Sequence, residues 1–127
     1  MKAVVDGYFL VLHEDLTAAR RLIDCVPRSC AFHLQQAAEK LVKAILSAEG
    51  VHAAADHNIG QLIARLPDGN EWKGDLVDLD YLSQFATTYR DPSERGRIAP
   101  PPDKATLEKY IALIDILAEE AKDWCER

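Results

Sequence analysis

Cysteine is scarce in this sequence, which has only Cys25, Cys30 and Cys125 and no C-x-x-C spacing. An odd number of thiols cannot form a complete disulfide framework, so reduced thiols in a reducing compartment are favoured. The segment from Met1 to Leu12 has one lysine, an aspartate and no small-residue cleavage site, unlike a signal peptide. No apolar run approaches the roughly 18 residues that cross a bilayer. We therefore expect a soluble, cytoplasmic protein.

Positive charge is also in short supply, with 15 basic against 21 acidic residues and a net charge of −6. Such a chain repels phosphates overall, so any contact with nucleic acid requires a local basic patch. The sequence has no P-loop, no G-x-G-x-x-G and no nucleophile elbow. Cysteine and carboxylate residues do not stand at ligand spacing around the four histidines, His13, His33, His52 and His57. We therefore predict neither a metal site nor a cofactor.

Helical periodicity is what the sequence has in abundance. The 127 residues, 48% of them hydrophobic, suit one globular domain over residues 1–127. Apolar residues recur at steps of three and four, and no hairpin signal or internal repeat is present. The pattern predicts an all-α, up-and-down antiparallel bundle of four long helices plus one short helix. The expected helices cover residues 5–23, 28–49, 56–66, 75–88 and 103–125.

The second expected helix has two contrasting faces. One arc is apolar and predicts the core contact, and Gly50 is a plausible stop for the helix. The opposite arc is a solvated face with a Glu39–Lys43 pair, or else it contacts a partner or ligand. We favour the second interpretation, and with it a homodimer, because Phe32 and Leu46 also fall on this arc and two adjacent glutamines are unusual on a helix rich in charges. The residues predicted to face an interface or ligand are Phe32, Gln35, Gln36, Glu39, Lys40 and Lys43.

A basic cluster stands in the longest irregular segment, residues 90–102, which holds four prolines and a glycine. Its arginines are Arg90, Arg95 and Arg97. Arg90 has a second interpretation, in which it only ends the preceding helix and favours the negative helix end. As the one concentration of positive charge on an acidic chain, the cluster predicts binding of a phosphate, from RNA or a nucleotide.

The second helix also contains the run A-F-H-L-Q-Q-A-A-E-K-L-V-K-A, residues 31–44. This run resembles the helix-two signature of the HEPN family, F-H-x-Q-Q-A-A-E-K-x-x-K-A. His57, followed by Ile59 and Leu62, is similar to the family's H-x-I/L-x-x-L segment. Residues 89–92, Y-R-D-P, resemble its R-Y-P-like element. The likeness covers nearly the whole chain, and the helix-two run is its specific part.

The resemblance implies a helical bundle that usually dimerises. It also implies a place beside a minimal nucleotidyltransferase, in toxin–antitoxin-like pairs. Many members of the family are ribonucleases that use an R-x(4–6)-H motif near the end of helix four. The resemblance therefore gives two hypotheses: a binding module that acts with a nucleotidyltransferase, a nucleotide or RNA, and a metal-independent ribonuclease toxin.

The family's catalytic motif is incomplete where it is expected. Arg90 can open it, but positions 95 to 97 are R-G-R, and no histidine follows His57. Arginine cannot take over the proton transfer because it stays protonated. A literal R-x-x-x-x-H does occur from Arg28 to His33, but a straight helix turns those side chains about 140° apart. We therefore favour the binding module. The alternative ribonuclease would use a displaced site of Arg28, His33 and Arg90, with Arg28 and His33 meeting across a dimer.

Overall fold

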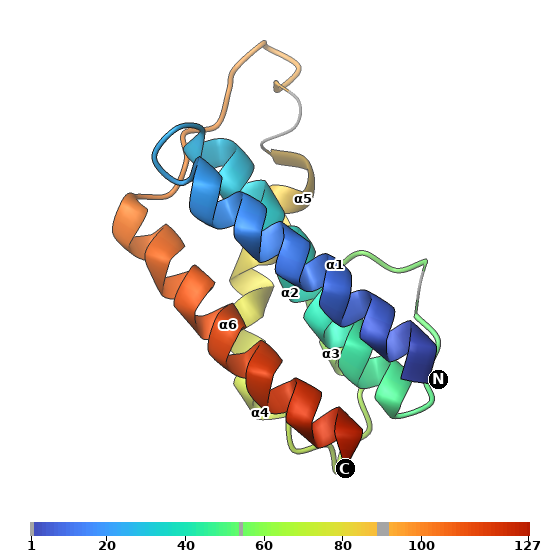
Figure 1. Ribbon diagram of the computed structural model, residues 1–127. Helices are drawn as coiled ribbons and strands as arrows, with labels where there is room; N and C mark the ends of the chain where they lie inside the picture. Colours follow the sequence, from blue (N-terminus) through green and yellow to red (C-terminus); the bar gives the residue numbers. More distant parts are fainter. Residues whose placement is uncertain (1, 54, 89–91) are drawn as a thin grey trace.

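The structure is a computed structural model that describes residues 2–53, 55–88 and 92–127. Three long helices dominate it: α1 (Lys2–Leu22), α2 (Pro27–Ala48) and α6 (Lys104–Glu126). Helices α1 and α2 are antiparallel, and α6 runs beside them in the direction opposite to α1 (Figure 1). This arrangement confirms the predicted all-α bundle. No strand occurs in the described residues, and no helix among them is long and apolar enough to cross a membrane.

Helix α2 is the centre of the bundle and contacts α1, α3, η1, α5 and α6. Because neighbours surround it, every residue from Leu41 to Ser47 is buried. Pro27 begins the helix at a position where its missing N–H is not needed. At the other end the predicted glycine stop is confirmed, because Gly50 has a φ of +81°. The N–H groups of Gly50 and Val51 donate to the carbonyls of Ser47 and Leu46, which closes the last turn.

The short helix α3 (Ile59–Ala64) begins two residues later than a helix that directly follows Asp56, where the sequence predicted it. Its N-cap is Asn58, whose side chain accepts from the N–H of Gln61 at 2.9 Å. Asp56 instead accepts from the backbone N–H of Asn58, which orders the approach to the helix. Two polar side chains, Asp56 and Asn58, thus order the start of this helix.

The fourth helical segment differs in type from the α-helix expected over residues 75–88. It comprises α4 (Lys73–Leu76), the 3₁₀ helix η1 (Val77–Gln84) and α5 (Phe85–Thr88). A 3₁₀ helix has three residues per turn, so a side chain every third residue stays on one face. The buried residues follow that spacing and all point into the core: Leu76, Leu79, Leu82 and Phe85.

Asp103 is the N-cap of helix α6, and its carboxylate accepts from the N–H of Thr106 at 2.8 Å. This hydrogen bond lowers the pKa of the Asp103 carboxyl. Lys104 lies 2.7 Å from Asp24 in the α1–α2 connection, and Arg20 lies 2.8 Å from Asp115. The first ion pair joins the start of α6 to the α1–α2 connection, at the same end of the bundle as residues 92–103 (Figure 1). The second joins the middle of α6 to the last turns of α1.

Candidate functional site: the polar ladder of α2 and the basic turn

Helix α2 carries a row of polar side chains at four-residue steps, which we name the polar ladder: Gln35, Glu39, Lys43 and Ser47. A four-residue step keeps the side chains on one face of an α-helix. All four are at least 94% buried, because this face lies inside the bundle. The Glu39–Lys43 pair of the solvated-face alternative is present at 3.0 Å, but it lies within the protein and not on a solvated face.

Glu39 is the hub of the ladder. Its Oε1 accepts from Gln35 at 3.2 Å, and its Oε2 accepts from Lys43 at 3.0 Å and lies 3.1 Å from Nδ1 of His57. Burial by itself raises the pKa of the Glu39 carboxyl. The hydrogen bonds from Lys43 and His57 and the charges of Lys43 and Lys40 outweigh burial, so the pKa is lowered. Glu39 is therefore ionised at neutral pH, and its carboxylate is held by hydrogen bonds within the protein.

The residues predicted to face a partner or ligand thus fall into two groups. Gln35, Glu39 and Lys43 contact one another inside the chain, and Leu46 is fully buried as well. Leu46 is therefore no evidence for a dimer surface. Of the predicted residues, only Phe32, Gln36 and Lys40 are half-buried and reach the surface beside the polar ladder. Gln36 donates to Gln35 at 2.6 Å, Lys40 donates to Gln36 at 3.1 Å, and Phe32 lies beyond them toward the start of the helix.

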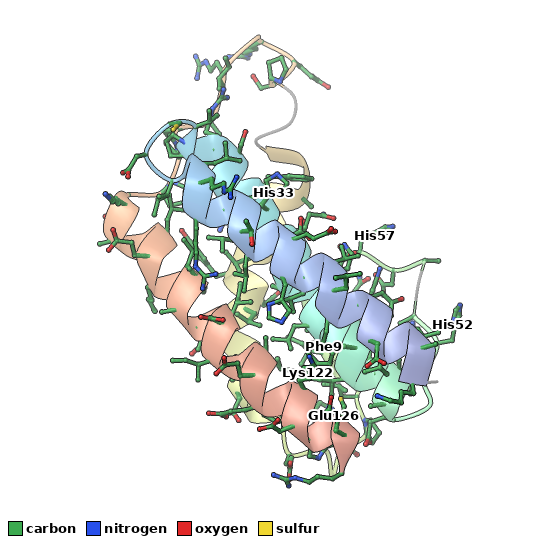
Figure 2. All side chains as sticks on the ribbon, viewed as in Figure 1. Phe9, His33, His52, His57, Lys122 and Glu126 are labelled. Carbon is green, nitrogen blue, oxygen red and sulfur yellow. The ribbon has the colours of Figure 1, made fainter. Side chains whose placement is uncertain are left out.

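Two histidine contacts were missed by sequence reasoning. His57, 69% exposed, joins the 51–58 connection to Glu39, and Nδ1 of His33 lies 3.0 Å from Oδ1 of Asp15 on α1. Figure 2 shows His33 and His57 at separate places along the length of the bundle. In each pair the partners are 18 residues apart in the chain, so no helical spacing signals the contact. Among the described residues no hydrogen bond or ion pair joins Arg28 to His33.

The basic turn, residues 93–97, presents two of the three predicted arginines. The N–H of Ser93 donates to the carbonyl of Arg97 at 2.8 Å, and the N–H of Gly96 donates back to Ser93 at 2.8 Å. Gly96 has a φ of +73°, a conformation that a side chain disfavours. Arg95 and Arg97 flank this glycine, and both are exposed. Arg90, the third predicted residue, lies outside the described residues.

A cavity of about 270 Å³ lies between the first turns of α1 and the last turns of α6. Figure 2 shows Phe9, Lys122 and Glu126 around it. Its thiol, Cys125, has a pKa raised to about 11 by burial and by the charges of Glu126 and Asp6. A thiol that stays protonated is a poor nucleophile. Within the described part of the chain, no group of three or more His, Cys, Asp or Glu residues could hold a metal ion.

The comparisons with known proteins agree with the fold. The model of the HEPN domain matches residues 13–126. The crystal structure of TT1696 from Thermus thermophilus superimposes with a TM-score of 0.74 at 20% sequence identity. The alignment covers 94% of this chain and 96% of that one. No curated protein sequence matches the chain. The family model includes the whole polar ladder and the basic turn, and on that match the chain belongs to the HEPN domain family.

Proposed function

We propose that this HEPN domain is a binding module that holds single-stranded RNA, or a nucleotide, by its phosphates at the basic turn. The observation that carries the proposal is the closed 93–97 turn, which displays Arg95 and Arg97 on a chain of net charge −6. Guanidinium groups bind phosphate oxygens through paired N–H donors. Glu94 lies beside them in sequence, so the turn as a whole carries one net positive charge.

Binding of a fluorescent single-stranded RNA, followed by anisotropy between about 50 and 200 mM salt, tests this proposal. The double variant Arg95→Gln/Arg97→Gln is expected to bind more weakly. Its salt dependence falls by about 1.4 in the log–log slope, or about 0.7 per lost phosphate contact. Lys109→Gln/Lys122→Gln on α6 is the matched control, because it changes the net charge by the same amount. Equal losses in both variants would mean that net charge alone attracts the RNA.

The proposal includes a homodimer and a protein partner, a minimal nucleotidyltransferase. Membership of the HEPN family supports the homodimer, since HEPN domains commonly dimerise. The nucleotidyltransferase partner is the one that the family resemblance of the sequence implies. If the partner is correct, a small nucleotidyltransferase co-expressed with this chain copurifies with it at a fixed ratio. Separate elution of the two proteins would remove the nucleotidyltransferase from the proposal and leave RNA binding unaffected.

A second candidate function is metal-independent cleavage of RNA, in a toxin–antitoxin pair. The contact between Asp15 and His33 favours it, because a histidine held by a carboxylate is a common general base. Within one chain, Arg28 is turned away from this histidine by the helix itself. Arg28 therefore takes part only if a second copy supplies it.

A further inference from the structure

We propose that the cavity between the first turns of α1 and the last turns of α6 is a binding site for a free α-amino acid with an apolar side chain. Lys122 contacts the carboxylate of this ligand, and Glu126 contacts its ammonium group. Binding there is independent of RNA binding at the basic turn, because the two places lie at opposite ends of the bundle (Figure 1).

The space for the cavity lies between two of the three long helices. Helix α1 packs closely along α2, whereas its contact with α6 is much less extensive. The cavity has a volume of about 270 Å³, and Figure 2 shows Lys122 and Glu126 of α6 opposite Phe9 of α1. Pockets for drug-sized ligands measure about 300–1,000 Å³, so this cavity suits a smaller metabolite, such as one amino acid.

The inner wall of the cavity is apolar. Val5 and Phe9 form it from α1, and both are buried. The cavity continues along α1 into a more open hollow of about 350 Å³, which reaches the exposed Leu10. An apolar side chain that lies from Phe9 toward Leu10 removes apolar surface from water on both partners. The wall therefore favours a ligand with an aliphatic or aromatic group.

The rim of the cavity carries two charges of each sign. On α1, the ammonium of Lys2 lies 3.3 Å from the carboxylate of Asp6, so these two charges compensate each other. On α6, Lys122 and Glu126 also stand four residues apart, but neither side chain has a hydrogen bond or ion pair within the described part of the chain. Burial, and after it the charges of Glu126 and Asp6, raise the pKa of the Cys125 thiol to about 11. The two carboxylates therefore converge on the wall that this thiol lines.

These charges select a ligand that is a zwitterion. A ligand with only one charge would leave Lys122 or Glu126 uncompensated at a site where water is displaced. Residues four apart on a helix hold their Cβ atoms about 5–6 Å apart. An α-amino acid carries its carboxylate and ammonium on one carbon, so both groups can meet this pair at once. The helix dipoles act in the same sense, because the positive end of α1 and the negative end of α6 border the cavity.

Calorimetric titration of the full chain with matched probes tests the site. L-Phenylalanine and L-leucine are expected to bind. Glycine lacks the apolar group, 3-phenylpropanoate lacks the ammonium, and 2-phenylethylamine lacks the carboxylate. Each of these three should bind at least about tenfold more weakly than L-phenylalanine, since hydrogen bonds to charged groups contribute about that factor or more. Changes in ¹⁵N–¹H NMR shifts should gather in residues 2–10 and 122–126.

Two exposed side chains provide the variants, Lys122→Met and Glu126→Gln. Each is expected to weaken L-phenylalanine binding by about tenfold. Lys122→Met should not weaken 2-phenylethylamine, which has no carboxylate, and Glu126→Gln should not weaken 3-phenylpropanoate, which has no ammonium. The matched controls, Lys109→Met and Glu120→Gln, make the same charge changes on α6 away from the cavity and should keep the affinity. Circular dichroism checks that each variant is folded.

Four results would overturn the proposal. The first is no binding of either amino acid at millimolar concentration. The second is equal affinity for L-phenylalanine and for a probe that lacks one of its charges. The third is the same loss in the control variants, which would reduce the effect to net charge. The fourth is a set of NMR shift changes centred on the basic turn, which would place the ligand at the other end of the bundle.

Discussion

Nδ1 of His57 and Oε2 of Glu39 lie 3.1 Å apart, although the histidine side chain is 69% exposed and that of Glu39 is only 2% exposed. The contact joins the 51–58 connection to the centre of α2. It connects the exposed His57 to the buried carboxylate of Glu39, which also accepts hydrogen bonds from Gln35 and Lys43. The stability of the bundle therefore depends on the hydrogen bonds that converge on this carboxylate.

Replacing Glu39 by glutamine is expected to destabilise the protein strongly. The change removes the buried carboxylate that the ammonium of Lys43, which is 4% exposed, contacts at 3.0 Å. Removing one partner of a buried ion pair costs about 3–5 kcal/mol. Urea unfolding followed by circular dichroism measures the free energy. Glu49→Gln, an exposed change at the end of the same helix, is the control and should cost little. A loss below about 1 kcal/mol in Glu39→Gln would show that the pair is neutral in net effect.

The pH dependence of stability gives a second prediction about Glu39. Its pKa in the folded chain is below the ordinary value of 4.5, so the unfolded chain takes up the proton first as pH falls. The contribution of Glu39 is complete above that ordinary value and is lost as pH falls through the lowered, folded-state pKa. Unfolding free energies of wild type and Glu39→Gln, compared from neutral pH down to about pH 3, measure it. Their difference is expected to shrink toward low pH, and a constant difference would contradict this assignment.

The His57→Ala variant is expected to lose about 1 kcal/mol of stability, the net value of one hydrogen bond. The loss should appear as faster amide hydrogen exchange in the 51–58 connection, while the rest of α2 stays protected. His52→Ala is the matched control. His52 accepts from Arg65 through its backbone carbonyl at 2.9 Å, a contact that alanine keeps. Equal effects in both variants would mean that the Glu39 contact contributes nothing specific.

Dimerisation can be measured by light scattering at micromolar concentration. A homodimer gives about twice the 14.2 kDa of one chain. If the half-buried residues of α2, Phe32, Gln36 and Lys40, form the interface, Phe32→Glu places a charge there and yields the monomer. Ile116→Glu on α6 is the control, because Ile116 is an exposed apolar residue on another helix and should leave the dimer intact. Wild type that elutes as a monomer would refute the homodimer.

Much of the fold could be predicted because the deciding signals are local. Gly50 ends α2 through its own backbone conformation, and the apolar periodicity places α1, α2 and α6. The 3₁₀ helix had a signal too, the three-residue spacing from Leu76 to Phe85, although we expected an α-helix there. The side of α2 that carries Gln35 and Leu46 was misjudged, because burial there depends on the 51–88 segment packing over it.

The candidate site was less predictable. Its histidine–carboxylate contacts bring together residues from separate elements, and each could pair with several charges of the sequence. Only the packing of α1 on α2 selects Asp15 for His33, and only the path of the 51–58 connection selects Glu39 for His57. The arginine cluster was visible in sequence, but the turn that displays Arg95 and Arg97 depends on backbone hydrogen bonds.

The hydrogen bonds that close the 93–97 turn also determine how much order remains to be imposed when a ligand arrives. Fixing a free backbone costs about 1–2 kcal/mol per residue, and here folding has already restricted five consecutive residues. A phosphate that reaches the turn needs to immobilise only the two guanidinium side chains, at about 0.5–1.5 kcal/mol each. Gly96→Ala would return part of that cost to the binding step by straining the turn, and so would weaken the affinity for phosphate without removing any charge.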